Sequence, residues 1–267
     1  TALTTDGAGA FEDISATGDL VADLTGTDDA NAVVALPFAF NYFGTDYTSI
    51  GVVSNGFAQF TGTSTAFSNG TLPSAAAPNN ALYPLWDDHD LDVAGAVYTQ
   101  LLGTIGVDAR FIIQWNNVGQ YNIGATPLDA NTYQIALFED GSFEFRYLTL
   151  GNEAAGSSGA GDTTTIGYEN ANGTLAYQST ETRDSLIAQL PVSLRGTSVL
   201  ADTGVCGNGC PACPADYDNN GGVDGGDLAA FFTDFEAGEG CADVDGNGGV
   251  DGGDLGYFFF VFEQGGC

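Results

Sequence analysis

Two copies of one acidic loop near the end of the chain carry its most distinctive chemistry. The first loop runs from Asp216 to Asp227 and the second from Asp243 to Asp254, 27 residues further on. Both place oxygen-bearing side chains at loop positions 1, 3, 5, 9 and 12, with glycine at position 6. Calcium is bound by about six to eight oxygens, and this spacing lets one short loop supply them. The pair of loops therefore predicts two calcium sites.

The segments around these loops differ from a helix-loop-helix calcium site. Position 12 is Asp instead of Glu, and no helix-forming run precedes either loop. A loop followed by a helix, duplicated and bounded by cysteines, resembles the dockerin-type repeats of secreted bacterial proteins, over roughly Cys213 to Cys267. In dockerins the two repeats fold around two calcium ions, and the paired helices can bind a partner module. A calcium-stiffened tail without a partner is the alternative.

The dockerin resemblance implies a ligand set for each ion, with the backbone carbonyl of position 7 included. For the first ion the implied ligands are Asp216, Asp218, Asn220, Gly222, Asp224 and Asp227. For the second they are Asp243, Asp245, Asn247, Gly249, Asp251 and Asp254.

All the cysteines lie close to these loops, at Cys206, Cys210, Cys213, Cys241 and Cys267. The spacing of the first three formally matches an iron–sulfur motif, but that chemistry needs a large α/β barrel and a reducing compartment. We therefore expect disulfides, as in other exported proteins, in preference to a zinc site. Because the number of cysteines is odd, one thiol stays free or bonds to another molecule. The sequence leaves the pairing open.

The charge balance excludes several classes of partner. The chain has 35 acidic residues, four arginines and no lysine, which gives a net charge of −31. Such a polyanion repels nucleic acid, and no apolar run reaches the roughly 20 residues needed to cross a bilayer. Hydrophobic residues make up 43% of the chain, so we expect a folded protein. The start at Thr1, without a charged and apolar leader, suits a mature secreted protein.

Up to about residue 200 the pattern is that of an antiparallel β-sandwich. Asn55-Gly56 and Asp140-Gly141 predict two hairpins, because both dipeptides tolerate the positive φ of tight turns. In the second hairpin we expect one apolar face and one partly wet face. The predicted strands are Val33–Phe40, Ser49–Val53, Phe57–Phe60, Ala96–Gln100, Phe111–Trp115, Tyr133–Phe138, Phe143–Tyr147, Thr164–Tyr168 and Val192–Val199. The expected fold is thus mostly β: a sandwich over 1–200 and a small C-terminal calcium-binding module of two loop-helix repeats over 201–267.

Five segments of this region resemble the extracellular nidogen-like domain, over about residues 30–175. They are Leu36–Phe43, Val53–Phe57, Pro84–Asp88, Phe111–Val118 and Leu137–Tyr147, in that order. The resemblance implies an extracellular, non-catalytic domain used in matrix, adhesion or surface architecture. It brings no ligand-binding residues with it.

Two further segments leave alternatives open. Asp87–Asp92 contains four carboxylates and the only histidine, His89. It suggests a third cation site or an acid/base pair acting on sugars, but our default is a solvated loop after a buried Trp86. The segment Thr1–Asp19 is either an ordinary first strand or an arm that completes a neighbour's sheet.

These features favour a secreted, non-enzymatic structural protein at the cell surface. We expect it to self-assemble into a fibre, layer or matrix, with calcium ordering the C-terminal module. The second expected helix, Leu255–Phe262, is apolar on every side, so either the sandwich or another subunit must cover it. The alternative is an adhesion or ligand-binding protein anchored to a cell-surface receptor module through its tail. A glycan-active enzyme using Asp87–Asp92 is a weaker third option.

Overall fold

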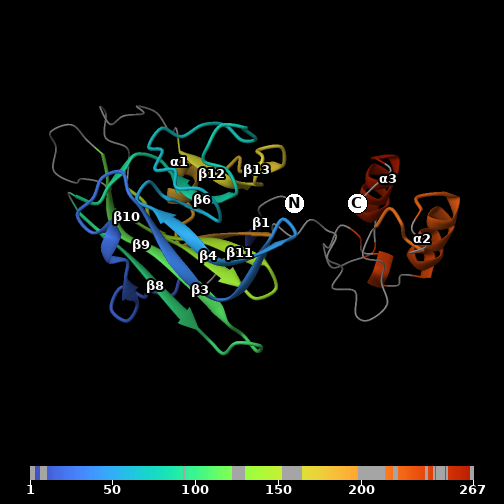
Figure 1. The fold of residues 1–267 in the computed structure, drawn as a ribbon, viewed down its shortest axis with the longest axis horizontal. Coiled ribbons are helices and arrows are strands. Elements are labelled where there is room, and N and C mark those ends of the chain that lie inside the picture. Colours follow the sequence, from blue (N-terminus) through green and yellow to red (C-terminus); the bar gives the residue numbers. More distant parts are fainter. Residues whose placement is uncertain are drawn as a thin grey trace. The chain divides into compact units, whose positions relative to one another are not determined.

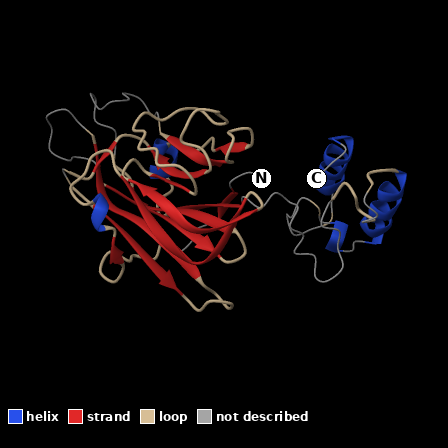
Figure 2. Cartoon of the chain, viewed as in Figure 1, coloured by secondary structure: helices blue, strands red, loops and turns tan. Residues whose placement is uncertain are grey.

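The computed structural model describes residues 4–6, 11–92, 94–121, 130–151, 164–197, 214–218, 222–237, 240–242, 244, 250 and 252–264. The chain divides into two compact units, Thr1–Ser198 and Val199–Cys267. Figure 1 traces the ribbon from one end of the chain to the other, and Figure 2 separates strands from helices. Each unit is described by itself.

The first unit consists of two antiparallel sheets, so the prediction of a mostly β sandwich is confirmed (Figure 2). One sheet has the order β1-β14-β11-β10-β9-β8-β2, with β7 paired to β9, and the other has the order β13-β12-β6-β5-β4-β3. The strands of the first sheet are β1 (Thr4–Asp6), β2 (Asp19–Leu20), β7 (His89–Asp90), β8 (Ala96–Leu102), β9 (Arg110–Gln120), β10 (Asn131–Phe138), β11 (Ser142–Thr149) and β14 (Val192–Thr197). Those of the second are β3 (Asn31–Tyr42), β4 (Thr45–Val53), β5 (Phe57–Gln59), β6 (Ala81–Trp86), β12 (Thr165–Glu169) and β13 (Ala176–Gln178).

Both predicted hairpins are present. Strands β4 and β5 pair through Val53 and Phe57, and Gly56 in the turn has φ of 73°. Strands β10 and β11 pair through Leu137 and Phe143, and Gly141 has φ of 81°. A side chain disfavours these left-handed conformations, which explains why glycine closes both turns. The other strands predicted from the sequence correspond to β3, β8, β9, β12 and β14. The short helices η1 (Ala22–Leu24) and α1 (Arg183–Ile187) complete the first unit.

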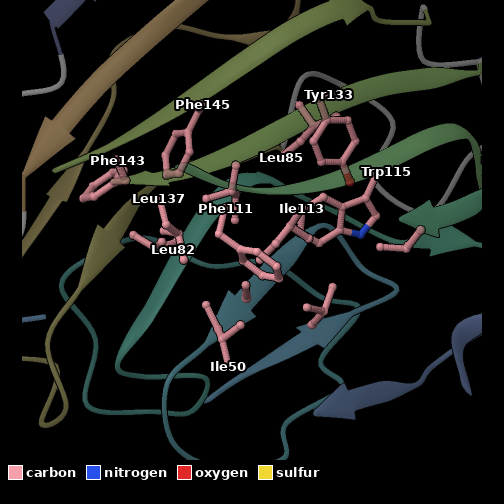
Figure 3. Close-up of a cluster of buried hydrophobic side chains, with 14 of the residues drawn as sticks. Ile50, Leu82, Leu85, Phe111, Ile113, Trp115, Tyr133, Leu137, Phe143 and Phe145 are labelled. Carbon is pink, nitrogen blue, oxygen red and sulfur yellow. The ribbon is translucent and has the colours of Figure 1, made fainter. Parts of the chain in front are cut away.

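The core lies between the two sheets and is rich in aromatic rings (Figure 3). Because side chains alternate along a strand, Phe111, Ile113 and Trp115 of β9 all point inward. The Trp115 indole is fully buried and stacks on the Tyr133 ring at 5.2 Å. Its Nε1 donates to the Val53 carbonyl at 3.0 Å, so the one polar atom of the ring is satisfied across the sandwich.

The outer face of the first sheet is covered, and the prediction of a partly wet face in the second hairpin was wrong. Gln134 of β10 is fully buried, and Arg146 of β11 is only 6% exposed. Residues 11–18 cross this face: Ile14 packs in a cluster with Ile112 and Ala136. Gln134 donates to the Glu12 carbonyl at 2.6 Å, and Arg146 pairs with the Glu12 carboxylate at 2.8 Å. A strap without regular alternation thus makes both faces of the hairpin dry.

The N-terminal segment also supplies both edges of the first sheet. Strand β1 pairs with β14, the last strand of the same unit, and β2 pairs with β8 at the opposite edge. Of the two alternatives for Thr1–Asp19, the structure therefore has the ordinary one, in which the segment completes the sheet of its own chain.

The second unit contains helices α2 (Gly225–Ala237) and α3 (Gly252–Gln264), with the short η2 (Gly240–Ala242) between them. The rings of Phe231 and Phe258 stack at 4.0 Å with their planes 1° apart. These two residues are separated by the same 27 positions as the two loops, and so are Tyr217 and Val244, which are also buried. The small core is therefore built from equivalent positions of the two repeats.

Two further features of the chain concern membranes and thiols. None of the helices that the structure describes is long and apolar enough to span a membrane. Cys241 is disulfide-bonded, and the other four cysteines lie outside the described residues. The bridging pattern therefore stays a prediction.

Candidate calcium site in the first loop

Three carboxylates of the first loop converge on one point. Asp216, Asp218 and Asp227 each offer an oxygen, and these oxygens all lie within 4.8 Å of one another. They are loop positions 1, 3 and 12: two come from the start of the loop and one from the first turn of α2. Like charges this close repel one another unless a cation lies between them, and an all-oxygen set suits a hard ion such as calcium.

Backbone hydrogen bonds hold the buried member of this group in place. The Asp227 carboxylate accepts from the backbone N–H of Asp218 at 3.0 Å and from that of Asp224 at 2.7 Å. Asp224 in turn accepts from the Gly226 N–H at 2.7 Å through its own carboxylate. Asp224 thus caps the second N–H of α2, while Asp227 in the first turn accepts from the N–H of the residue before the helix, and both bonds satisfy N–H groups that the helix leaves free at its start. The same contacts fold the loop back onto its helix.

The electrostatics of Asp227 favour its ionised form. Burial acts to raise the pKa of this carboxyl, but hydrogen bonds from Asp224, Asp218 and its own backbone outweigh burial and hold the pKa below the usual 3.8. Ionised acids in the first turn of a helix also interact favourably with the helix dipole. Asp227 is therefore a negatively charged group available to a cation.

Gly226 keeps this cradle open. A Cβ at this position would lie 2.8 Å from Asp218 Oδ2 and 3.1 Å from Asp224 Oδ1. A side chain would therefore displace the oxygens of two implied ligands. Glycine at position 226 therefore allows the carboxylates of Asp218 and Asp224 to lie close to the backbone there.

The other predicted ligands are placed only in part. Asp224 and Gly222 are described, whereas Asn220 lies outside the described residues. Of the ligands predicted in the second loop, Asp254 is described, and it is fully buried, as is its counterpart Asp227. The remaining ligands of that loop lie outside the described residues: Asp243, Asp245, Asn247, Gly249 and Asp251.

The segment Asp87–Asp92 is not the solvated loop that we expected. Asp87, Asp88, His89 and Asp90 are each less than 10% exposed, as is Trp86 before them. Asp87 faces the buried guanidinium of Arg183 at 3.4 Å, a partner from α1 that no local pattern in the sequence indicated. Burial lowers the pKa of His89 to about 3, with the nearby charge of Arg183 as a further cause, so its imidazole is neutral. His89 Nδ1 lies 3.2 Å from the Tyr133 hydroxyl.

Comparison with known proteins places the first unit in a family. Residues 3–195 match the family described as NIDO related, and the chain belongs to this family. Over a stretch of 160 residues the chain is 29% identical to the Dendrite extension defective protein 1 of Caenorhabditis elegans. The match covers 51% of this chain but only 14% of that protein. No solved structure matches the chain. The nidogen-like resemblance is thus confirmed, and the dockerin-type interpretation of the second unit stays a prediction.

Proposed function

We propose that this chain is a secreted, non-enzymatic structural protein that self-assembles at the cell surface as a fibre, layer or matrix. Calcium orders its C-terminal module, which makes the contact with the next subunit. The observation that carries the calcium step is the convergence of Asp216, Asp218 and Asp227 at the start of α2.

The first unit supports an extracellular, adhesion-type role. It belongs to the NIDO-related family, and the relative is named for a defect in dendrite extension. Its conspicuous acidic segment is engaged in structure: Asp87 pairs with Arg183, and His89 is enclosed and neutral. These contacts argue for architecture over acid/base chemistry on sugars.

Calcium would order the second unit by cancelling repulsion at the start of each helix. An ion among the three carboxylates draws the beginning of the first loop to Asp227, and so to α2. By the repeat, a second ion would be held by the loop from Asp243 to Asp254 at the start of α3. Disulfides among Cys213, Cys241 and Cys267 would clamp the same module.

Self-assembly is supported by the surface that this module offers. Phe259 of α3 is 37% exposed, although an aromatic ring favours burial. The net charge of −31 opposes contact between copies unless cations neutralise it. An adhesion protein whose paired helices bind a cell-surface receptor module is the alternative, because the same surface would serve it.

Light scattering on the full chain, with millimolar calcium and then with excess chelator, tests the proposal. We expect large particles in calcium that dissolve on chelation. Asp216→Asn combined with Asp243→Asn removes position 1 of both loops and should abolish the particles, whereas the exposed Asp19→Asn on β2 should not. A monomer in both conditions would refute self-assembly, and particles that ignore both calcium and the variants would refute the calcium step.

A further inference from the structure

A second group of converging carboxylates lies in the first unit, in a different part of the chain from the calcium loops. Asp28 and Asp29 follow η1, and Asp88 lies between β6 and β7; their carboxylate oxygens all lie within 4.8 Å of one another. The two segments are distant in the sequence: one follows η1 and leads into β3, and the other links β6 of the second sheet to β7 of the first. Folding therefore brings the three acids together against their mutual repulsion.

The surrounding backbone holds this group in a defined shape. The Leu91 N–H donates to the Thr27 carbonyl at 3.1 Å, which joins the two acidic segments directly. Asn55, fully buried in the β4–β5 turn, donates to Asp29 Oδ1 at 2.6 Å and accepts from the His89 N–H at 2.8 Å. One rigid amide thus positions both segments.

An independent observation points to a missing ligand. Asp28 Oδ1 is shielded from solvent, yet no hydrogen-bond donor reaches it. A buried carboxylate oxygen without a donor is costly, and a bound cation would relieve that cost. Asp88, which contributes to the same group, is only 7% exposed, so water screens little of its charge.

The chain itself has little positive charge to spare for this group. Its four arginines all form ion pairs with other acids: Arg110 and Arg146 with Glu12, Arg195 with Glu144, and Arg183 with Asp87. It has no lysine, and the imidazole of His89 is neutral. A cation from solution would therefore add positive charge that these side chains, which are paired elsewhere or neutral, do not supply.

We propose that Asp28, Asp29 and Asp88 form a further calcium site, which joins the turn before β3 to the segment that leads into β7. A purely carboxylate set favours a hard divalent ion, and calcium tolerates irregular geometry. Burial raises the pKa of Asp28, and the nearby charges of Asp29, Asp90, Asp88 and Asp92 raise it further. The ion fastens together the two sheets at this end of the sandwich.

Counting bound calcium on the full chain by equilibrium dialysis tests the site. Asp28→Asn combined with Asp88→Asn should bind one ion fewer than the wild type, while the control Asp19→Asn should bind as many as the wild type. Because both tryptophans lie in the first unit, terbium luminescence excited through tryptophan should also fall in the double variant. Equal calcium counts in wild type and double variant would overturn the proposal. The loop variant Asp216→Asn with Asp243→Asn should still bind this ion. The ion counts of the two double variants therefore distinguish a failure of the C-terminal sites from a failure of this one.

Thermal unfolding supplies a second test that does not depend on the ion count. In chelator, Asp28→Asn should unfold at a higher temperature than the wild type, because it removes a negative charge that lies close to those of Asp29 and Asp88. In calcium the order should reverse, because the variant loses a ligand. A shift of the same sign in both conditions would overturn the site and leave Asp28 a purely structural residue. Near-ultraviolet circular dichroism shows whether the double variant folds. If it does not, Asp29→Asn, a change at an exposed residue, replaces it in the calcium count and in the unfolding measurements.

Discussion

The two units of this chain neutralise their acidic residues in different ways. In the first unit, the buried or half-buried acids Glu12, Asp87 and Glu144 each face an arginine. In the second unit, from residue 201 onward, thirteen acids are present without a single basic residue. The acids of the sandwich can therefore form ion pairs within their own unit, whereas the acids of the C-terminal unit cannot. We therefore propose that the second unit depends on cations from solution, whereas most of the first does not.

The hydrophobic cores differ in the same direction. The sandwich buries rings from both sheets around Trp115, whereas the smaller core of the second unit is organised around the stacked rings of Phe231 and Phe258. A small unit buries a smaller fraction of its surface and needs disulfides or metal ions to be stable. We therefore expect the two units to respond differently to mutation and to chelation.

The largest effect is expected when the core of the sandwich is opened. Trp115→Ala removes a fully buried ring and its bond to Val53, and should lower the free energy of unfolding of the first unit by about 3–5 kcal/mol. Denaturant unfolding followed by near-ultraviolet circular dichroism measures this. The loss should be the same with and without calcium, and Val107→Ala, at a residue 80% exposed, should change little. Simultaneous loss of α2 and α3 would break the comparison, because it would make the two units one cooperative structure.

The corresponding change in the second unit is Phe258→Ala. It removes one half of the stacked ring pair and should cost about 3 kcal/mol, the lower end for such a change because a small core can collapse around the gap. Hydrogen exchange of the α2 and α3 amides should show loss of protection, while the strands stay protected. Phe259→Ala, one position on and 37% exposed, is the matched control. Equal protection in both variants would mean that the ring pair is not the core of this unit.

Removal of calcium should have the next largest effect. A ligand present at a hundred times its dissociation constant stabilises the folded state by about 2.7 kcal/mol, so a chelator should destabilise the second unit by an amount of this order for each ion. Hydrogen exchange at the start of α2, around Asp227, should accelerate first. The sandwich should keep its fold, because its core does not require an ion. Unchanged exchange in α2 on chelation would contradict the assignment of the first loop.

Local patterns in the sequence were enough to predict most of the long strands, with β6 (Ala81–Trp86) missed, but not what covers them. Asn55-Gly56 and Asp140-Gly141 identified two hairpins, because turn chemistry is a property of neighbouring residues. The alternation of Gln134 and Ala136 with Tyr133 and Ile135 suggested a wet face, yet the strap around Glu12 buries it. That contact joins residues 122 positions apart, and no periodicity reports a pairing over such a distance.

The candidate sites show the same limit. The ligand positions of the C-terminal loops can be predicted from spacing, because one short segment would supply all of them. The carboxylates of Asp28 and Asp29 meet Asp88 only after the sandwich has folded, so the sequence around Asp88 indicated acidity without its partners. Likewise, Arg183 lies 96 positions from Asp87, and the acidic segment therefore resembled a solvated loop.

The smallest effect, and the one that most directly compares the charges of the two units, is expected from two matched Glu→Gln changes. Glu12→Gln weakens the ion pairs with Arg110 and Arg146 that hold the strap, and should destabilise the first unit by about 1 kcal/mol at neutral pH. The hydrogen bond from Arg110 is the main cause that holds the pKa of Glu12 below 4.5. An acid whose pKa is lowered by folding stabilises at higher pH, so this difference between wild type and variant should vanish as the pH falls through that lowered pKa.

Glu236→Gln makes the same chemical change in the unit that has no basic residues. Glu236 is exposed in the last turn of α2, where a negative charge opposes the helix dipole and adds to the repulsion from neighbouring acids. Its neutralisation should therefore stabilise the second unit, by about 0.3–1 kcal/mol at low salt and by less as salt screens the charge. Chemical denaturation in calcium, with each unit followed by its own signal, measures both variants. Stability changes of opposite sign in the two variants would confirm that the sandwich uses its acids as ion-pair partners, while the negative charge of the C-terminal unit must be offset by cations from solution. Changes of equal sign would remove the basis of the comparison.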